Sequence, residues 1–169
     1  MNLRAPRVRL HVRRSLTVAL LMSLPIGAVE AGVPLPGGCA DISTIAPFTQ
    51  FRFEHFQAIF DTLTNPKEPD SQLCSRCHPG DFGAGGLGLG AGSSYDNLVG
   101  VPSGQDNTIL RVAPGSPLNS LLFQKLNCVQ PQVGDRMPPD GSLSLTQQAF
   151  FYDWIRLGAP LSRLGFEDR

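Results

Sequence analysis

The chain has 169 residues, 41% of them hydrophobic, and equal numbers of basic and acidic side chains, 14 of each. This length suits one domain with an additional segment. Residues 1–31 hold five of the basic residues and one of the acidic ones, so the remainder carries a net charge of about −4. Because the remainder is mildly acidic, the sequence gives no indication of binding to nucleic acid or to an anionic membrane surface.

The first 31 residues have the order of features that is typical of a secretory signal peptide. Scattered arginines precede an apolar run at residues 16–24, and the small-residue exit Val29-Glu30-Ala31 follows. The apolar run is too short to span a membrane. Arg13-Arg14 fits a twin-arginine signal poorly. We therefore expect general export, a periplasmic or secreted location, and no membrane span in the mature chain.

Residues 32–47 are rich in glycine and proline and predict an irregular arm that carries Cys39. Cys39 and Cys128 belong to no other motif, and disulfides persist in exported proteins, so a bridge between them is predicted. Two free thiols are the alternative. A lipid anchor on Cys39 is the least favoured of the three alternatives, because Leu35-Pro36-Gly37-Gly38 is a poor lipobox.

A first helix is predicted for residues 48–63, and Asn65-Pro66 ends it. Four apolar residues recur at steps of three and four and share one face: Phe53, Phe56, Phe60 and Leu63. Because apolar residues cover much of its circumference, we expect this helix to be substantially buried.

The segment Cys74-Ser75-Arg76-Cys77-His78 has the Cys-x-x-Cys-His spacing of a c-type haem attachment site. On a short helix, both thiols reach the same porphyrin edge and form thioether bonds, while His78 offers an imidazole to the iron. A redox dithiol is an alternative, but it requires a βαβ pattern that is absent. A zinc site that recruits Cys128 is another, but it leaves Cys39 unexplained. The prediction is one covalent haem c.

Residues 80–92 contain seven glycines. Three of them formally match a dinucleotide-binding pattern: Gly83, Gly85 and Gly88. We discount that match, because the preceding strand and following helix that it requires are absent. The segment instead predicts a loop close to the haem edge, where missing side chains permit close approach. Leu87 and Leu89 are expected to pack on the porphyrin.

The second half of the chain predicts two longer helices around a loop. A short helix from Ser93-Ser94 and an extended stretch at 109–112 come first. Ser116-Pro117 then begins a helix with a leucine stripe, and a capping box of Ser144 and Gln147 begins the last helix, which ends at Gly158. With no convincing long strand, the prediction is an all-α fold.

The loop at residues 129–143 supplies the candidate for the second axial ligand of the iron. Met137 is the only methionine outside residues 1–31, and Pro138 and Pro139 stiffen its loop. We predict that Met137 binds the iron opposite His78. His55, on the first helix, is the rival ligand, and a vacant distal position is the third possibility.

In their order, these motifs resemble the class I cytochrome c fold, and in particular the planctomycete-type cytochrome c domain. The resemblance covers about residues 50 to 160 and is carried by the haem motif and by three later segments: residues 112–117, 134–139 and 154–159. It implies a small all-α domain at 48–169 wrapped around one covalent haem, with long Gly/Pro-rich loops. It also implies thioether bonds at Cys74 and Cys77, axial ligation by His78 and Met137, and packing of the first helix against the last. The cysteines at 39 and 128 and the glycine loop depart from the simplest family pattern.

The resulting functional prediction is an electron-transfer protein, not an enzyme, that passes single electrons between a redox donor and a redox acceptor. Two alternatives stay open. One is a haem enzyme or ligand sensor with an open distal site. The other is a haem subunit of a periplasmic dehydrogenase complex.

Overall fold

The computed structural model describes residues 36–62, 73–80 and 83–163. The predicted signal peptide and the Asn65-Pro66 pair lie outside these ranges. The first helix, predicted for residues 48–63, is shorter than expected at both ends, because it begins at Phe53 and ends at Phe60, with Asp61 as its C-cap. In chain order, the elements are β1 (Gly37–Cys39), β2 (Phe51–Arg52), α1 (Phe53–Phe60), α2 (Cys74–Cys77), η1 (Ala84–Gly86), α3 (Ser94–Leu98), η2 (Pro117–Asn119), α4 (Leu121–Asn127), β3 (Cys128–Gln130), α5 (Leu145–Arg156) and β4 (Ser162–Arg163).

The prediction of an all-α fold is wrong, because the helices are accompanied by two small antiparallel sheets. β1 pairs with β3, with Cys39 opposite Cys128, and β2 pairs with β4. Strands of two or three residues are too short for an alternating pattern to be visible in the sequence. The pairing of β2 also takes Phe51 out of the predicted first helix, which begins at Phe53. The architecture is mixed, with helices predominant.

The first and last helices pack against each other through aromatic side chains, as the resemblance implies. On α1, Phe56 is fully buried and its ring lies 4.6 Å from that of Trp154 on α5, measured between centroids. The indole Nε1 of Trp154 donates to the carbonyl of Pro160 at 2.9 Å, which holds the segment just after the helix against α5. A buried phenylalanine contributes about 1.5–3 kcal/mol, and each ring pair adds about 0.5–1.5 kcal/mol.

The capping box predicted at the start of the last helix is present. Ser144 Oγ accepts a hydrogen bond from the Gln147 backbone at 3.2 Å, and the Gln147 side chain accepts one from the Ser144 backbone at 3.0 Å. The helix then runs to Arg156, and Gly158 follows with a φ of +94°. These contacts fix the orientation with which α5 enters the core.

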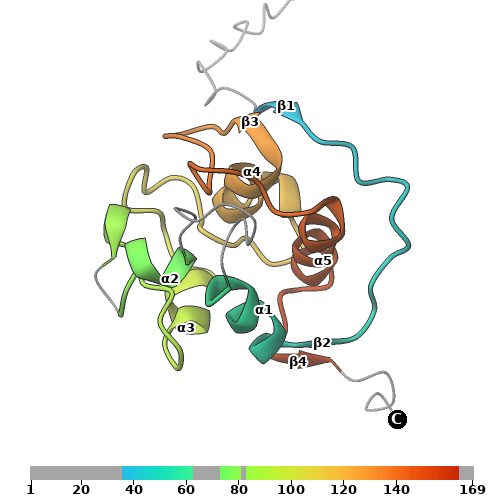
Figure 1. The fold of residues 1–169 in the computed structure, drawn as a ribbon, viewed down its shortest axis with the longest axis horizontal. Helices are drawn as coiled ribbons and strands as arrows, with labels where there is room; N and C mark the ends of the chain where they lie inside the picture. The colour runs from blue at the N-terminus through green and yellow to red at the C-terminus, as the bar shows by residue number, and fades with distance from the viewer. Residues whose placement is uncertain (1–35, 63–72, 81–82, 164–169) are drawn as a thin grey trace, which may run out of the picture. The chain divides into compact units, whose positions relative to one another are not determined.

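The arm between β1 and β2 runs along the outside of α5 (Figure 1) and is fixed at both ends. At its start, a disulfide joins Cys39 to Cys128, the pairing expected from the sequence. At its end, the backbone N–H of Phe48 donates to the buried carboxylate of Asp153 on α5 at 2.8 Å. The disulfide indicates that the chain resides in an oxidising compartment.

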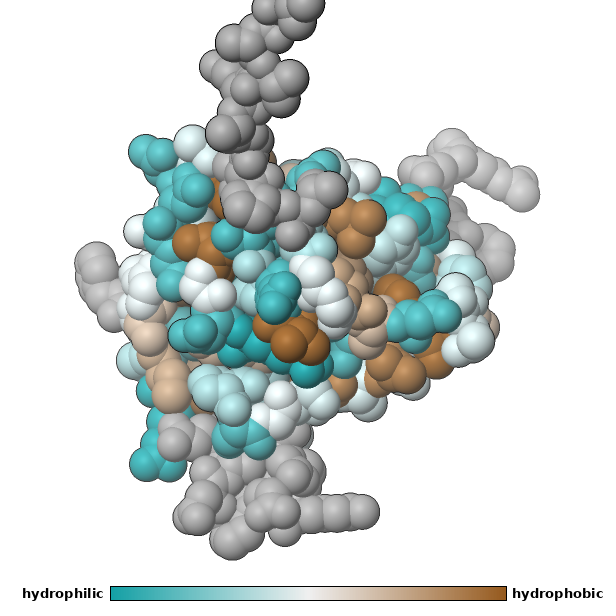
Figure 2. Space-filling view, turned by 90° about the horizontal axis from the view of Figure 1, so that it is seen from above, coloured by the Kyte–Doolittle hydropathy of each residue, from teal (hydrophilic) through white to brown (hydrophobic). Residues whose placement is uncertain are grey.

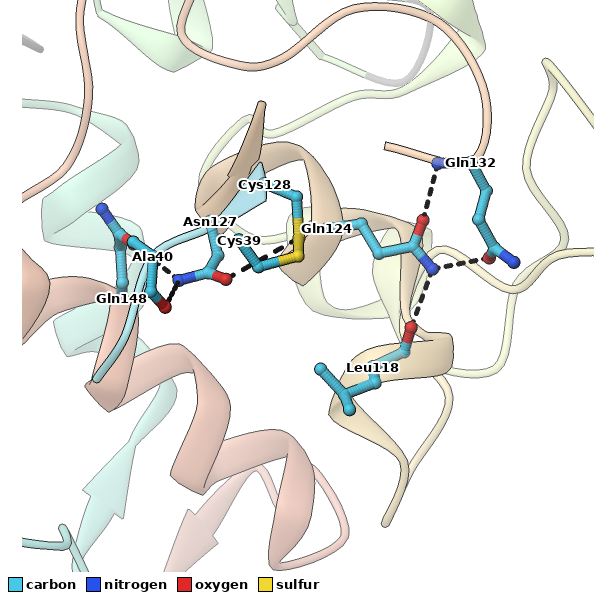
Figure 3. The surroundings of a disulfide bond; sticks show 8 residues. All are labelled: Cys39, Ala40, Leu118, Gln124, Asn127, Cys128, Gln132 and Gln148. Carbon is cyan, nitrogen blue, oxygen red and sulfur yellow. Dashed lines mark hydrogen bonds between the residues drawn. A yellow bond between two sulfur atoms is a disulfide. The ribbon is translucent and has the colours of Figure 1, made fainter. Parts of the chain in front are cut away.

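Buried amides reinforce the arm beside the disulfide (Figure 3). The Asn127 amide donates both to the carbonyl of Ala40 at 3.0 Å and to the Gln148 side chain at 2.9 Å. The Gln148 amide donates in turn to the carbonyl of Leu143 at 2.7 Å. One network therefore connects the arm, α4, α5 and the end of the loop that carries Met137.

Among the described residues, no helix is long and apolar enough to cross a membrane. On the face shown in Figure 2, apolar side chains form separate patches between polar ones. Large exposed apolar side chains occur at positions scattered along the sequence: Leu118, Val129, Leu145 and Leu161.

Candidate cofactor site

The four site residues predicted from the sequence line one cavity. Cys74, Cys77 and His78 come from α2 and its end, and Met137 comes from the loop after β3. The cavity has a volume of about 500 Å³, and most of its lining side chains are apolar. A volume of roughly 300–1,000 Å³ is usual for pockets that hold cofactors and other small molecules.

His78 is held by three hydrogen-bonded contacts. Its backbone N–H donates to the carbonyl of Cys74 at 3.0 Å, and its carbonyl accepts from Leu89 at 2.8 Å. Its ring Nδ1 lies 3.2 Å from the carbonyl of Leu87. A carbonyl can only accept, so this contact places the imidazole proton on Nδ1 and leaves the lone pair of Nε2 available. A histidine that binds a metal through Nε2 is commonly oriented in this way.

The glycine loop packs directly against the motif, as its composition predicts. A Cβ added to Gly83 would overlap the Cα of His78 and the carbonyl oxygen of Leu87. A Cβ added to Gly90 would lie 3.1 Å from the backbone nitrogen of Gly80. These close approaches bring Leu87 and Leu89 into the cavity wall.

Met137 is positioned by α4. Its backbone N–H donates to the carbonyl of Lys125 at 2.8 Å, and the Lys125 ammonium donates to the carbonyl of Asp135 at 3.0 Å. Pro138 is buried and also lines the cavity. The leucines of α4 complete the same wall: Leu121, Leu122 and Leu126. The loop is therefore attached to a helix that is itself part of the site.

The two thiols of the motif differ in their surroundings. Cys77 is exposed, whereas Cys74 is partly buried. Burial raises the pKa of the Cys74 thiol to about 11, and the nearby carboxylates of Asp140 and Asp61 add to this effect. A free Cys74 is therefore a neutral thiol at neutral pH, which is unfavourable for a redox dithiol that acts through a thiolate.

The structure also bears on the zinc alternative and on the rival ligand. Cys128 lies in the disulfide, so it is not available to a zinc ion. In the parts of the chain that the structure describes, no group of three or more His, Cys, Asp or Glu side chains is arranged to hold a metal ion. His55 is exposed on α1 and is not among the residues that line the cavity.

Five polar residues of the cavity are not predicted from the sequence, and one of them, Asp140, lies in the same loop as Met137. Ser103, Gln105 and Arg111 come from the segment between α3 and η2, and Lys125 comes from α4. No motif identifies them, because they meet only when the 99–112 segment folds back through the bridges Val99–Val112 and Pro102–Leu110. Arg111 belongs to the stretch that was predicted to be extended.

The residues present fit a covalently bound haem. Two thiols and a preoriented imidazole lie in one part of the cavity wall, a thioether lies in another, and apolar side chains line the space that they share. Comparison of the chain with protein-family models, with curated proteins and with solved structures finds no match.

Proposed function

We propose that this protein is an exported c-type cytochrome that carries single electrons through one covalent haem. The observation that supports the proposal most directly is the convergence of Cys74, Cys77, His78 and Met137 on one apolar cavity. Cysteine and histidine are adjacent in the sequence, but Met137 joins them only through the fold. A thiol pair, an imidazole and a thioether are the groups that attach and ligate a haem with His/Met coordination.

In this proposal, the chain attaches, orients and shields the haem. Cys74 and Cys77 would form the thioethers, and His78, with Nδ1 donating to Leu87, would present Nε2 to the iron. Met137 would approach from the loop that α4 holds. The haem supplies a one-electron ferric/ferrous couple. Because the His78 ring contacts the carbonyl of Leu87 and the Met137 backbone is bonded to α4, little in the site would have to rearrange when the charge changes.

Electron exchange would take place where the lining of the cavity reaches solvent. Cys77, Ala84 and Pro139 all line the cavity and are exposed to solvent. A haem edge in this position would meet a partner at short range. The partners would be a redox donor and a redox acceptor that dock over a small surface and dissociate quickly. The disulfide fits a periplasmic or secreted location.

The test is an optical spectrum of the exported protein, oxidised and then reduced with dithionite, together with a pyridine haemochrome assay. We expect a covalent c-type haem and, in the oxidised form, a weak far-red band from the bond between iron and thioether sulfur. Met137→Ala should abolish that band, whereas His55→Ala should leave it unchanged.

Two outcomes would contradict the proposal. A chain without covalent haem would remove its basis. A high-spin haem that binds carbon monoxide readily in the wild-type protein would show an open distal site, which is the property of a haem enzyme or a ligand sensor.

A further inference from the structure

The disulfide joins a residue at the surface to a residue in the core. Cys39 is exposed at the end of β1, whereas Cys128, directly after α4, is fully buried. Thiol–disulfide exchange begins when a thiolate attacks one of the two sulfurs, so its rate depends on access to that sulfur. Because Cys39 is exposed, a thiol partner can attack the bridge there without any unfolding of the core around Cys128.

The arm that the disulfide holds is hydrogen-bonded to the helices at its two ends. Near the bridge, Ala40 and Asn127 exchange two hydrogen bonds, at 3.1 and 3.0 Å. At the other end, the backbone of Phe48 is bonded to Asp153. Among the described residues, the hydrogen bonds of residues 41–47 stay within the arm, and a second cavity of about 520 Å³ is lined by these residues and by α4 and α5. Opening the bridge therefore removes the covalent part of one of the two attachments.

The loop that carries Met137 has both of its ends fixed beside this disulfide. It begins directly after Cys128. It ends at Leu143, whose carbonyl accepts a hydrogen bond from the Gln148 amide at 2.7 Å. Gln148 accepts in turn from Asn127 at 2.9 Å, next to the bridge (Figure 3). The same small region therefore fixes the arm and both ends of the loop.

The end of α4 connects the arm to Met137 itself. Asn127 donates to the carbonyl of Ala40 in the arm, and Lys125, two residues earlier, accepts from the Met137 backbone at 2.8 Å. Asn127 and Gln148 are each 2% exposed. If the arm leaves, a buried N–H of Asn127 loses its acceptor, and an unpaired buried donor is costly. The amide network must then rearrange, and the rearrangement reaches the loop.

We propose that the bridge between Cys39 and Cys128 is a redox-active site, opened by a dithiol protein, and that its state controls how firmly Met137 is held at the proposed haem. A thiolate of the dithiol protein attacks the sulfur of Cys39, a mixed disulfide forms, and Cys128 leaves and takes up a proton. The second thiol of the partner then displaces Cys39. Two electrons and two protons pass to this chain, and the partner keeps a disulfide. The inference rests on the proposed function, in which Met137 is an iron ligand.

The expected consequence is a reciprocal coupling between the bridge and the distal position of the iron. With the bridge open, the loop is less constrained, so Met137 is away from the iron in a larger fraction of the ferrous protein. Carbon monoxide then binds with a higher apparent affinity, in proportion to that fraction. A coupling of ordinary size changes the affinity about 5–150-fold. By linkage, carbon monoxide must favour opening of the bridge by the same factor.

The experiment uses the purified ferrous holoprotein in buffers of reduced and oxidised dithiothreitol, with and without carbon monoxide. Thiols are trapped by alkylation and counted by mass spectrometry, which reports the state of the bridge independently of the haem. Carbon monoxide should move the midpoint of bridge reduction to a lower proportion of reduced dithiothreitol. In Cys39→Ser, which cannot form the bridge, the affinity for carbon monoxide should exceed that of the wild type by the same factor. Thr44→Ala, at an exposed position of the arm, is the control and should match the wild type.

Three results would overturn the inference while leaving the proposed function intact. The first is an equal affinity for carbon monoxide in Cys39→Ser and the wild type. The second is a midpoint of bridge reduction that carbon monoxide does not change. The third is a wild-type bridge that stays closed in reduced dithiothreitol until urea unfolds the chain, which would make the bridge purely structural.

The proposed function is tested separately and first, by the haemochrome assay and the far-red band of the wild type with its bridge closed. A chain without covalent haem would remove the proposed function and, with it, the coupling to Met137. If Cys39→Ser alone fails to retain haem, the dithiothreitol titration of the wild type with and without carbon monoxide decides the question.

Discussion

The imidazole Nδ1 of His78 and the carbonyl oxygen of Leu87 lie 3.2 Å apart, and Gly83 lies between the two residues in the glycine loop. Gly83 is the residue that permits this contact, because an added Cβ would overlap the backbone of both partners. The φ of Gly83 is −69°, so the requirement comes from space and not from backbone conformation. A glycine is needed at position 83 because the loop passes close to the backbone of His78 there.

Gly83→Ala should therefore disturb His78, the proposed axial ligand, from a position that contributes no ligand itself. Because the overlap is with backbone atoms, relief requires the loop to move, and we expect a destabilisation of at least about 2 kcal/mol. We also expect less covalent haem per chain and a changed spectrum of the axial histidine. The measurements are urea unfolding and the haemochrome assay.

Gly141→Ala is the matched control for this substitution. Gly141 has no positive φ, and a Cβ there would meet nothing within 4 Å. It should behave like the wild-type protein in both assays. Equal behaviour of the two alanine variants would show that the loop does not position His78.

The disulfide between Cys39 and Cys128 closes a long loop, with a sequence separation of 89. In the chain-entropy description, a loop of this length contributes up to about 4–5 kcal/mol to stability. Replacing both cysteines by serine should lower the midpoint of urea unfolding. Reductant should shift the wild-type midpoint toward that of the double variant and leave the double variant unchanged. An unchanged wild-type midpoint in reductant would show that the bridge does not stabilise the fold.

The local parts of the site could be predicted from the sequence, whereas the long-range ones could not. The spacing from Cys74 to His78, the capping box at Ser144 and the glycine loop are all encoded within short segments. Arg111 and Lys125 reach the cavity only through the folding of separate segments, so no spacing identifies them. Met137 is the exception among the long-range residues, since the sequence holds no other methionine outside residues 1–31.

The difference between local and long-range features also explains why the prediction of an all-α fold is wrong. Residues 37–39 contain two glycines and a cysteine, which have no tendency to form a strand by themselves. They form β1 by pairing with β3, in a register that places Cys39 opposite Cys128. Likewise, Phe51 continues the apolar pattern of the first helix but is paired with Arg163 near the end of the described chain. Neither pairing leaves a local signal.

Gln148 occupies the centre of the buried amide network and tests its contribution to stability. It is 2% exposed, accepts from Asn127 and donates to the carbonyl of Leu143. Gln148→Leu keeps much of the volume but removes the acceptor of one Asn127 N–H and the donor to the carbonyl of Leu143, which should cost about 1–3 kcal/mol for each buried group. Unfolding can be followed by fluorescence of Trp154, the single tryptophan of the chain.

Thr146→Val, at an exposed position of α5, controls for helix propensity. It should shift the unfolding midpoint very little. A Gln148→Leu midpoint that differs from the wild type no more than that of Thr146→Val would mean that the network does not stabilise the attachment of the arm.

Leu98 tests whether the apolar wall of the cavity sets the properties of the proposed haem. It is fully buried on α3 and lines the cavity, and it also belongs to the main core. Leu98→Ala should destabilise the fold by about 2–5 kcal/mol. Because the vacated space would give water better access to the proposed haem, the ferric form should gain stability and the reduction potential should fall.

The control for Leu98→Ala is Leu118→Ala, where the side chain is 56% exposed and does not line this cavity. We expect its stability to change by no more than about 0.5 kcal/mol and its potential to stay at the wild-type value. Urea unfolding and potentiometry on the same samples separate the two effects. If Leu98→Ala lost stability but kept both the wild-type potential and the wild-type resistance to carbon monoxide, Leu98 would be part of the core without shielding the cofactor.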